Sequence, residues 1–356
     1  MSATGFPLVF DGHNDTLLDL PKRTGAGRDF FVQGETGHID FPRAQAGGLG
    51  GGFFACYVPS PRPEGAGDDP AALMAMFRDP AYRPATPDFE ASTRKVMSMA
   101  AELFAIEGRS EGRVKVVRTA DDLAECLSNG TFAAILHIEG AEAIDTDLDA
   151  LHVYYKAGLR SLGPVWSRAN AFAEGVPFTF GRSPDTGPGL TDAGKALVHE
   201  CNQLGVLLDL SHLNEKGFWD VASLSTAPLV ATHSNAHALS ASPRNLTDKQ
   251  LAAIKESDGM VGVNFNVGFL TADGNNETAM PLDTMVRHFD YLVEHLGIER
   301  VGFGSDFDGA TMPDDLSDAS KLPNIMQALK DHGYDDASLH KLAHENWVRV
   351  LRLTWK

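Results

Sequence analysis

Histidine and carboxylate side chains recur in this sequence directly after short apolar runs. His13 and Asp15 stand two residues apart after the run LVF, so on an extended chain both side chains point to the same face. Glu139, His212 and His233 each close a later apolar run. A histidine at a buried strand end must be hydrogen-bonded or metal-bound, because an unpaired polar group there is costly. Several such residues together favour a metal site over isolated core histidines.

Nitrogen and carboxylate ligands without thiolates suit Zn²⁺, with Mn²⁺, Fe²⁺ and Co²⁺ as competitors. A catalytic zinc usually has three protein ligands, so three histidines and two carboxylates exceed the needs of one ion. They fit two ions if one carboxylate bridges. Two divalent cations would outweigh the negative charge of Asp15, Glu139 and a shared hydroxide, and the remaining positive charge can polarise a carbonyl group.

These residues need elements that bring distant segments together. A glycine followed by a short apolar run recurs after predicted helices, for example at Gly130, Gly205 and Gly259, and glycine suits a left-handed helix C-cap. Continuous apolar runs are typical of strands buried on both faces of a parallel sheet. We predict eight such strands: Leu8–Asp15, Gly52–Pro59, Phe132–Glu139, Arg160–Ser167, Val206–His212, Pro228–Ser234, Met260–Asn266 and Val301–Asp306.

Helical segments fill most of the gaps between these strands. Eight alternating strands and helices predict an α/β fold, a (β/α)8 TIM barrel, with a doubly wound open sheet as the structural rival. In a barrel the polar strand ends meet at one mouth, where barrel active sites lie. The predicted helices include Phe89–Glu107, Thr191–Leu204, Thr247–Glu256, Pro281–Leu296 and Ala337–Leu353.

We expect residues 1–356 to form a single domain, because α/β barrels reach this length. The stretch Ser60–Pro87 breaks the alternation and is rich in Pro, Gly and Asp. We predict a loop insertion here, after the second strand and on the catalytic face. It is either a lid or a solvated insertion.

Composition excludes several classes of partner. With 30 Lys and Arg against 48 Asp and Glu, the formal net charge of −18 argues against nucleic acid or an anionic membrane as the main partner. Three widely spaced cysteines form no disulfide framework. We see no signal peptide and no membrane-spanning apolar run, so a cytoplasmic setting is expected.

The sequence resembles the membrane (renal) dipeptidase family, peptidase family M19, a branch of the amidohydrolase superfamily of (β/α)8 metallo-dependent hydrolases. The matching segments run in order from Asp11 to Arg352 and cover nearly the whole chain. They are DGHNDTLLDL, HIEGAEAI, DLSH, THSNAHALSASPRNLTD, VGFGSDFDGA and HENWVRVLR. The resemblance implies a homodimer and a cofactor of two divalent metal ions, with Zn²⁺ favoured.

By position in these motifs, the resemblance implies that His13 and Asp15 hold one metal. Glu139 bridges both metals, and His212 and His233 hold the second. These assignments agree with the donor types read from the residues themselves.

The resemblance also implies the catalytic and substrate-binding residues. Asp306 matches the aspartate that carries a proton from the bridging water to the leaving amine, and its place after an apolar run lets a base reach that water. Arg244 matches the arginine that binds the substrate's terminal carboxylate, which suits the planar guanidinium. The predicted activity is hydrolysis of dipeptides by a metal-activated hydroxide. The alternatives are an amidohydrolase for N-acyl amino acids or another small amide or lactone, and a non-catalytic metal-binding protein.

One position departs from the family pattern. A histidine that helps to bind the scissile carbonyl oxygen usually follows strand four, and here the matching residue is Trp166. Trp can donate one hydrogen bond but cannot protonate an oxyanion. Either Arg168 or Asn170 replaces the histidine, or Trp166 only shapes the pocket. We therefore expect an altered substrate range and list Trp166 and Asn170 with the substrate-binding residues.

Overall fold

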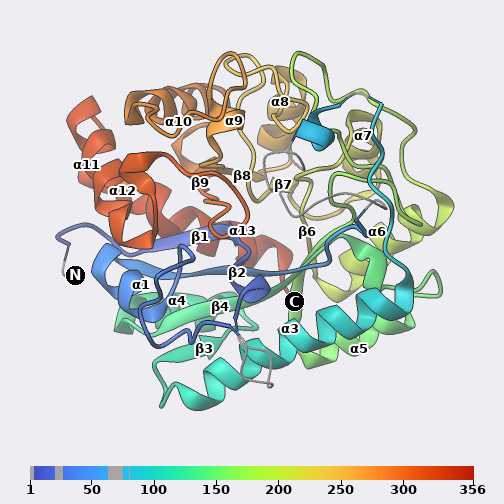
Figure 1. Cartoon of the computed structure of the whole chain (residues 1–356), viewed down its shortest axis with the longest axis horizontal. Coiled ribbons are helices and arrows are strands. Elements are labelled where there is room, and N and C mark those ends of the chain that lie inside the picture. Colours follow the sequence, from blue (N-terminus) through green and yellow to red (C-terminus); the bar gives the residue numbers. More distant parts are fainter. Residues whose placement is uncertain (1–3, 21–26, 63–74, 80) are drawn as a thin grey trace.

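The computed structural model describes residues 4–20, 27–62, 75–79 and 81–356. Eight parallel strands follow one another around the centre of the molecule (Figure 1). In chain order they are β1 (Val9–Asn14), β2 (Leu49–Tyr57), β4 (Phe132–Glu139), β5 (Leu159–Gly163), β6 (Leu207–Leu208), β7 (Val230–Ala231), β8 (Met260–Val263) and β9 (Val301–Phe303). Their spatial order is β6-β5-β4-β2-β1-β9-β8-β7.

The two end strands of this order, β6 and β7, meet and close the sheet. A parallel bridge joins Asp209 to Val230, and Leu210 N donates to Val230 O over 2.8 Å. The Asp209 carboxylate accepts hydrogen bonds from Thr232 N at 2.8 Å and from Thr232 Oγ1 at 2.5 Å. The predicted (β/α)8 barrel is therefore confirmed, and the doubly wound open sheet is excluded.

All eight predicted strands are present, although most are shorter than predicted. The sequence did not reveal β3 (Val114–Val116), which pairs only with β4, because three residues give too short a pattern. The predicted helix Ala337–Leu353 is interrupted. It consists of α12 (Asp336–His340), a π-helical turn over Lys341–Glu345, and α13 (Asn346–Thr354).

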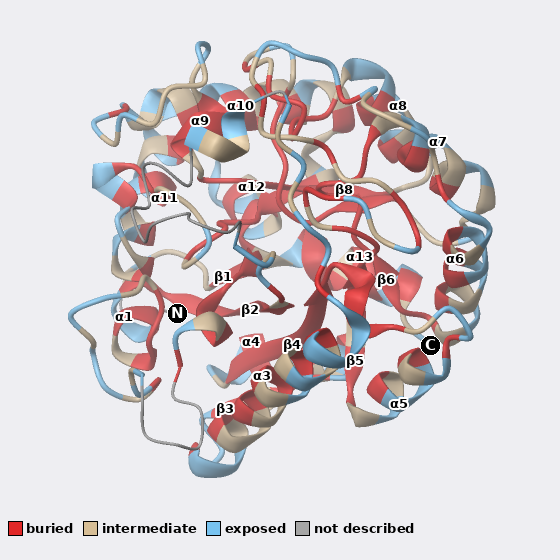
Figure 2. Cartoon of the chain, turned by 45° about the vertical axis from the view of Figure 1, so that its right-hand side comes forward, coloured by how far each residue is buried: buried red, intermediate tan, exposed pale blue. Residues whose placement is uncertain are grey.

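Helices surround the strands, and their exposed residues lie on the outer side of the molecule (Figure 2). At the start of α6, Thr191 caps the helix and accepts a hydrogen bond from Gly194 N. The bounds are α1 (Phe41–Gly47), α3 (Phe89–Arg109), α4 (Ala120–Asn129), α5 (Asp149–Ala157), α6 (Asp192–Leu204), α7 (Glu215–Leu224), α8 (Asp248–Glu256), α9 (Val267–Leu270), α10 (Leu282–Leu296) and α11 (Leu322–His332).

The predicted glycine caps are found at two of the three named positions. Gly130 and Gly205 follow α4 and α6 with φ of 81° and 73°, in the left-handed region. The prediction is wrong at Gly259, because Asp258 takes the left-handed conformation there, with φ of 57°. Gly259 is required for space instead, since a Cβ would collide with the backbone oxygen of Leu229.

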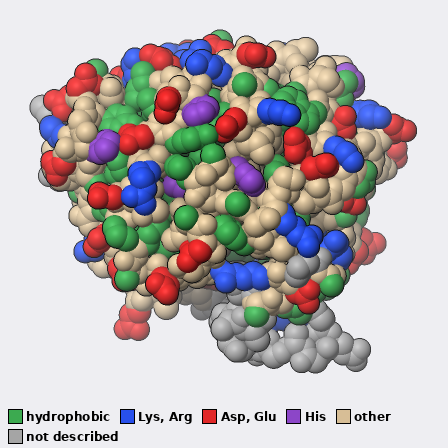
Figure 3. Space-filling view, turned by 90° about the horizontal axis from the view of Figure 1, so that it is seen from above, with side chains coloured by type: hydrophobic (Ala, Val, Ile, Leu, Met, Phe, Trp, Pro, Cys, Tyr) green, Lys and Arg blue, Asp and Glu red, His purple; other side chains and the backbone are tan. Residues whose placement is uncertain are grey.

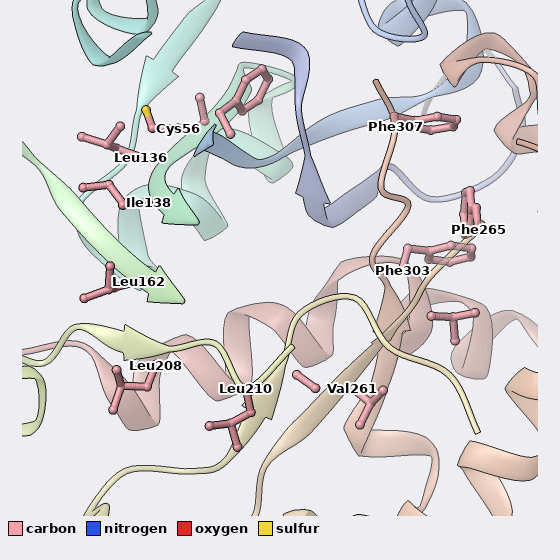
Figure 4. Packing of buried hydrophobic residues seen from close by; sticks show 14 of the residues in the cluster. Cys56, Leu136, Ile138, Leu162, Leu208, Leu210, Val261, Phe265, Phe303 and Phe307 are labelled. Atoms are coloured by element: carbon pink, nitrogen blue, oxygen red, sulfur yellow. The ribbon is translucent and has the colours of Figure 1, made fainter. Parts of the chain in front are cut away.

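Apolar side chains fill the molecule in two places. A large cluster lies between the strands and the helices, and part of it is shown in Figure 4, including Phe265, Phe303 and Phe307. A second cluster includes Phe53 and Trp347, whose rings lie 5.1 Å apart. Trp347 Nε1 donates to Phe303 O, so α13 contributes a buried floor beneath the polar strand ends.

Among the helices that the structure describes, none is long and apolar enough to cross a bilayer. On the face seen in Figure 3, acidic and basic side chains are interspersed with apolar ones.

Candidate active site

The five residues predicted as metal ligands come together at the C-terminal ends of β1, β4, β6 and β7. Glu139 lies at their centre. Its Oε1 is 2.9 Å from His212 Nε2 and 3.6 Å from His233 Nε2. Its Oε2 is 3.8 Å from His13 Nε2, which is itself 3.6 Å from Asp15 Oδ2. Each carboxylate oxygen of Glu139 therefore faces a different pair of side chains, as a bridging ligand would.

Two groups of donor atoms share Glu139. In His13–Asp15–Glu139 and in Glu139–His212–His233, the ligand atoms all lie within 4.8 Å of one another. The two groups are adjacent, because the rings of His13 and His233 stack with centroids 3.8 Å apart. All five side chains are buried.

The charges at this cluster fit cations. Burial raises the pKa of the Glu139 and Asp15 carboxyls and lowers the pKa of His212 and His233 well below its usual range. For His13, burial is outweighed by the carboxylates of Glu139 and Asp15, which raise its pKa to about 10. Among the described residues, both ring nitrogens of His13 and Asp15 Oδ1 lack a hydrogen-bond partner. These buried donors fit metal ions, which would supply the missing positive charge.

Residues behind the two later histidines orient their rings. Thr232 Oγ1 donates its proton to Asp209, so His233 Nδ1, 2.8 Å from the same oxygen, must donate to it. His212 Nδ1 lies 2.8 Å from Ser167 Oγ. Both Nδ1 atoms are thus engaged and both Nε2 atoms face Glu139, an arrangement common in metal sites. Asp209 lies within the predicted strand Val206–His212, but the sequence did not reveal this role.

His137 lies on β4, two residues before Glu139, and next to His13. Its ring is 5.3 Å from His13 and 6.4 Å from Phe53, and its Nδ1 is 2.9 Å from Ser161 Oγ. Burial lowers the pKa of His137 to about 3, so the ring is neutral. It packs between the polar cluster and the apolar floor.

Asp306 follows β9 and lines the cavity above the cluster. Its Oδ2 accepts a 2.9 Å hydrogen bond from Asn264 Nδ2, and its backbone N donates to His13 O over 3.0 Å. The φ of 63° is unusual for a residue with a side chain and turns the chain sharply at the strand end. Asn264 was not predicted, because an amide after an apolar run gives no distinctive signal.

Arg244 is buried beside the same cluster. Its Nη2 donates to His233 O over 3.1 Å, and its guanidinium lies 5.3 Å from the centre of the Phe269 ring. Its Nε and Nη1 have no acceptor among the described residues. A buried cation with two unused donor nitrogens is suited to an anionic group of a ligand.

A cavity of about 470 Å³ opens above the cluster, and Asp15, Glu139, His212 and Asp306 line it. Trp166 also lines it, with its ring centroid 5.9 Å from that of His212. Six aromatic residues form much of the wall: Tyr57, Phe77, Trp166, Phe178, Phe180 and Phe269. Their packing could not be predicted, since several lie on irregular loops.

The structure does not bring Arg168 or Asn170 to this cavity. Arg168 forms an ion pair with Glu142, 2.9 Å between Nε and Oε1, with both side chains buried. Asn170 Nδ2 donates to Pro164 O over 2.8 Å, and its Oδ1 accepts from Phe172 N. Both side chains bind the loop that carries Trp166, and neither lies where the missing histidine would act.

The predicted loop Ser60–Pro87 lies only partly within the described residues. Residues 63–74 and 80 lie outside the described part of the chain. Residues 75–78 form a helical turn, from which Phe77 and Arg78 line the cavity.

A closed parallel barrel with a buried His, Glu and Asp cluster at the C-terminal ends of its strands defines a metal-dependent hydrolase. The sequence profile of the membrane dipeptidase family (peptidase family M19) matches residues 4–355, and the chain belongs to this family. The predicted family and the predicted metallo-dipeptidase activity are thereby confirmed.

Known proteins agree with this assignment. The chain is 52% identical to a metallo peptidase from Rhodobacter sphaeroides crystallised with a phosphinate mimic of the dipeptide L-Ala-D-Ala, with a TM-score of 0.93 over 98% of this chain and 100% of that one. It is 51% identical to the dipeptidase AC of family M19, with a TM-score of 0.92, covering 98% and 99% of the two chains. An uncharacterized Klebsiella pneumoniae protein is 50% identical over 247 residues, which are 69% of this chain and 91% of that protein.

Proposed function

We propose that this dipeptidase binds two divalent cations, Zn²⁺ in the first instance, between His13 and Asp15 on one side and His212 and His233 on the other. The position of Glu139 is the observation that carries this proposal, because its two oxygens face the two pairs separately. When bound, the cations would supply Lewis acidity, polarising the scissile carbonyl and lowering the pKa of water towards neutrality.

Asp306 is the proposed proton carrier. Asn264 holds Oδ2, so the carboxylate is oriented while Oδ1 stays available to the cavity. Asp306 accepts a proton from the attacking water and then gives it to the departing amine. The peptide C–N bond breaks, a C–O bond forms, and the carboxylate returns to its starting state.

Arg244 binds the carboxylate at the C-terminal end of the substrate. Its two unused nitrogens and its burial support this role, since a charge-assisted hydrogen bond is stronger away from water. The requirement for this carboxylate limits the enzyme to dipeptides and to other short acyl amino acids. The relative crystallised with a mimic of L-Ala-D-Ala supports a substrate with a D-residue at the C-terminal position.

Trp166 shapes the cavity and does not move a proton. The indole can donate one hydrogen bond, but it has no group that titrates near neutral pH. Its contact with His212 places it beside the scissile group, where it limits the space available to the substrate.

The test is turnover of L-Ala-D-Ala and L-Ala-L-Ala by protein loaded with Zn²⁺, together with the variant Asp306→Asn. We expect kcat to fall by about 10²- to 10⁴-fold, the usual contribution of general acid–base catalysis. The bound metal should stay at the wild-type level. Asp273→Asn, a carboxylate at the rim of the same cavity, is the matched control and should retain activity. Full activity of Asp306→Asn would reject the proton transfer.

A further inference from the structure

Four aromatic side chains form a pocket within the cavity, which we call the four-ring pocket: Tyr57, Phe77, Trp166 and Phe178. Trp166 is at its centre, with ring centroids 5.2 Å from Tyr57, 5.5 Å from Phe77 and 5.4 Å from Phe178. Phe77 and Phe178 also contact each other edge to face, with centroids 5.9 Å apart. All four side chains are half-buried and line the cavity, so part of each ring surface remains open to a ligand.

Tyr57 and Trp166 of the four-ring pocket lie on the opposite side of the barrel from the proton carrier. Tyr57 ends β2 and Trp166 follows β5, so these two residues flank β4 and Glu139. Asn264 and Asp306 follow β8 and β9, and β8 lies halfway round the barrel from β4. Arg244 follows β7, on the side of Asn264 and Asp306. The metal cluster therefore lies between Arg244 and the Tyr57 side of the pocket, whereas Phe178 stacks on Phe269, with 6.0 Å between ring centroids, and Phe269 contacts Arg244.

This layout fixes which part of a dipeptide reaches the aromatic rings. If Arg244 holds the C-terminal carboxylate and the scissile bond lies over Glu139, the N-terminal residue extends towards β2 and β5. We propose that the four-ring pocket is the subsite for the side chain of the substrate's N-terminal residue, and that it selects large apolar side chains. This inference rests on the proposed role of Arg244.

The chemistry of the pocket supports an apolar occupant. One cation, Arg168, lies 5.5 Å from the Tyr57 ring and 5.3 Å from the Trp166 ring, and its charge is met by Glu142. Arg168 also donates to Val58 O over 2.8 Å, which anchors the loop behind both rings. Because the neighbouring charge is already paired, the exposed ring surface is stabilised most when an apolar group of the ligand covers it.

A histidine at position 166 would leave this subsite smaller in area and more polar. The indole offers a larger apolar face and reaches Phe77 and Phe178 as well as Tyr57. We infer that Trp166, where the family has a histidine, serves as the central wall of this side-chain pocket.

The experiment compares two substrate series with Zn²⁺-loaded enzyme. In the first, L-Xaa-D-Ala, the N-terminal residue is Ala, Leu, Phe, Asp or Lys. In the second, L-Ala-D-Xaa, the same side chains occupy the C-terminal position. We expect kcat/KM to rise by about 10- to 100-fold from Ala to Phe in the first series, and to vary less in the second. Asp and Lys in the first series should be poorer than Leu.

Variants identify the pocket as the cause. Phe77→Ala and Trp166→Ala should reduce the Phe-to-Ala ratio of the first series by about 10-fold or more, and Trp166→Phe should restore most of it. Phe89→Ala is the matched control, because Phe89 is an exposed phenylalanine at the start of α3. It should keep the wild-type ratio.

Different outcomes separate this proposal from the proposed function. Equal rates across the first series, with good turnover, would overturn the pocket assignment and leave the dipeptidase mechanism intact. A preference for Phe in the second series would show that the pocket holds the C-terminal side chain. An absence of turnover for every dipeptide would instead contradict the proposed function itself.

Discussion

Replacing Arg244 with methionine should remove most of the activity on dipeptides without harming the fold. Methionine keeps an unbranched chain of similar length and removes the charge. The Nη2 hydrogen bond to His233 O is lost, while Nε and Nη1 have no acceptor to lose in the described part of the chain. Burial lowers the pKa of Arg244, and the nearby carboxylates of Asp306 and Glu139 offset this shift only in part. Keeping the charged guanidinium buried therefore costs stability in the protein without substrate. The midpoint of thermal unfolding should therefore not fall.

The size of the effect follows from the two unused nitrogens. A hydrogen bond between charged groups contributes about 1.5 to 3 kcal/mol, so two such bonds to the substrate carboxylate contribute about 3 to 6 kcal/mol. That range corresponds to a loss of about 10²- to 10⁴-fold in kcat/KM. The loss should be confined to substrates that carry the carboxylate.

The assay measures kcat/KM for L-Ala-D-Ala and for its C-terminal amide, in wild-type protein and in Arg244→Met. In wild-type enzyme, kcat/KM should be about 10²- to 10⁴-fold higher for the acid than for the amide. In the variant, kcat/KM should be nearly the same for the two substrates. Arg287→Met, at an exposed position of α10, is the control and should keep the wild-type preference. An unchanged preference in Arg244→Met would refute the carboxylate assignment. Equal losses on both substrates, or an unfolded variant, would show a structural role instead.

Three further predictions concern other residues. Asn264→Ala removes the donor to Asp306 Oδ2, so kcat in steady-state assays should fall about 10-fold with little change in KM, since one charge-assisted hydrogen bond is lost. Glu139→Gln removes the charge shared by both ligand groups, and elemental analysis should show clearly less metal than in wild type, with an unchanged content contradicting the bridging position. Burial lowers the pKa of His288 to about 4 from its usual 6.5, so the unfolded state binds more protons below pH 6.5 and stability falls as pH drops towards 4. Denaturant unfolding should show wild type losing about 2 kcal/mol more than His288→Gln between pH 7 and pH 5.

The sequence predicts the barrel well because its strands are buried on both faces. A run such as Phe132–Glu139 is recognised as a strand without knowing which residues face the core, because all of its residues are buried and most are apolar. Strand length is less predictable. The run Val206–His212 forms only the two-residue strand Leu207–Leu208. Asp209 adds a single bridge to Val230, and the chain then turns at His212, where φ is 69°. That turn depends on packing at the mouth, which no local pattern encodes.

Some residues of the site can likewise be predicted from the sequence, and others are revealed only by the fold. His13 and Asp15 could be found because two ligand types recur at the spacing of one strand face. Asp209 has an ordinary position in the sequence, and only the fold shows that it reaches Thr232 on the next strand. Phe178 lies on an irregular loop after β5, so neither period nor motif marks it as part of the cavity wall.

The short contact between β6 and β7 should make the closure of the barrel the least stable part of the sheet when the protein carries no metal. β2 and β4 pair over seven residues from Gly51 to Tyr57, whereas β6 and β7 are joined through Asp209 and its neighbours. His212 and His233 follow these two short strands, so a cation held by both histidines would crosslink the place where the barrel closes. Chelation should then speed amide hydrogen exchange and proteolysis selectively there, which would make the cation a determinant of the protein's lifetime as well as of its chemistry.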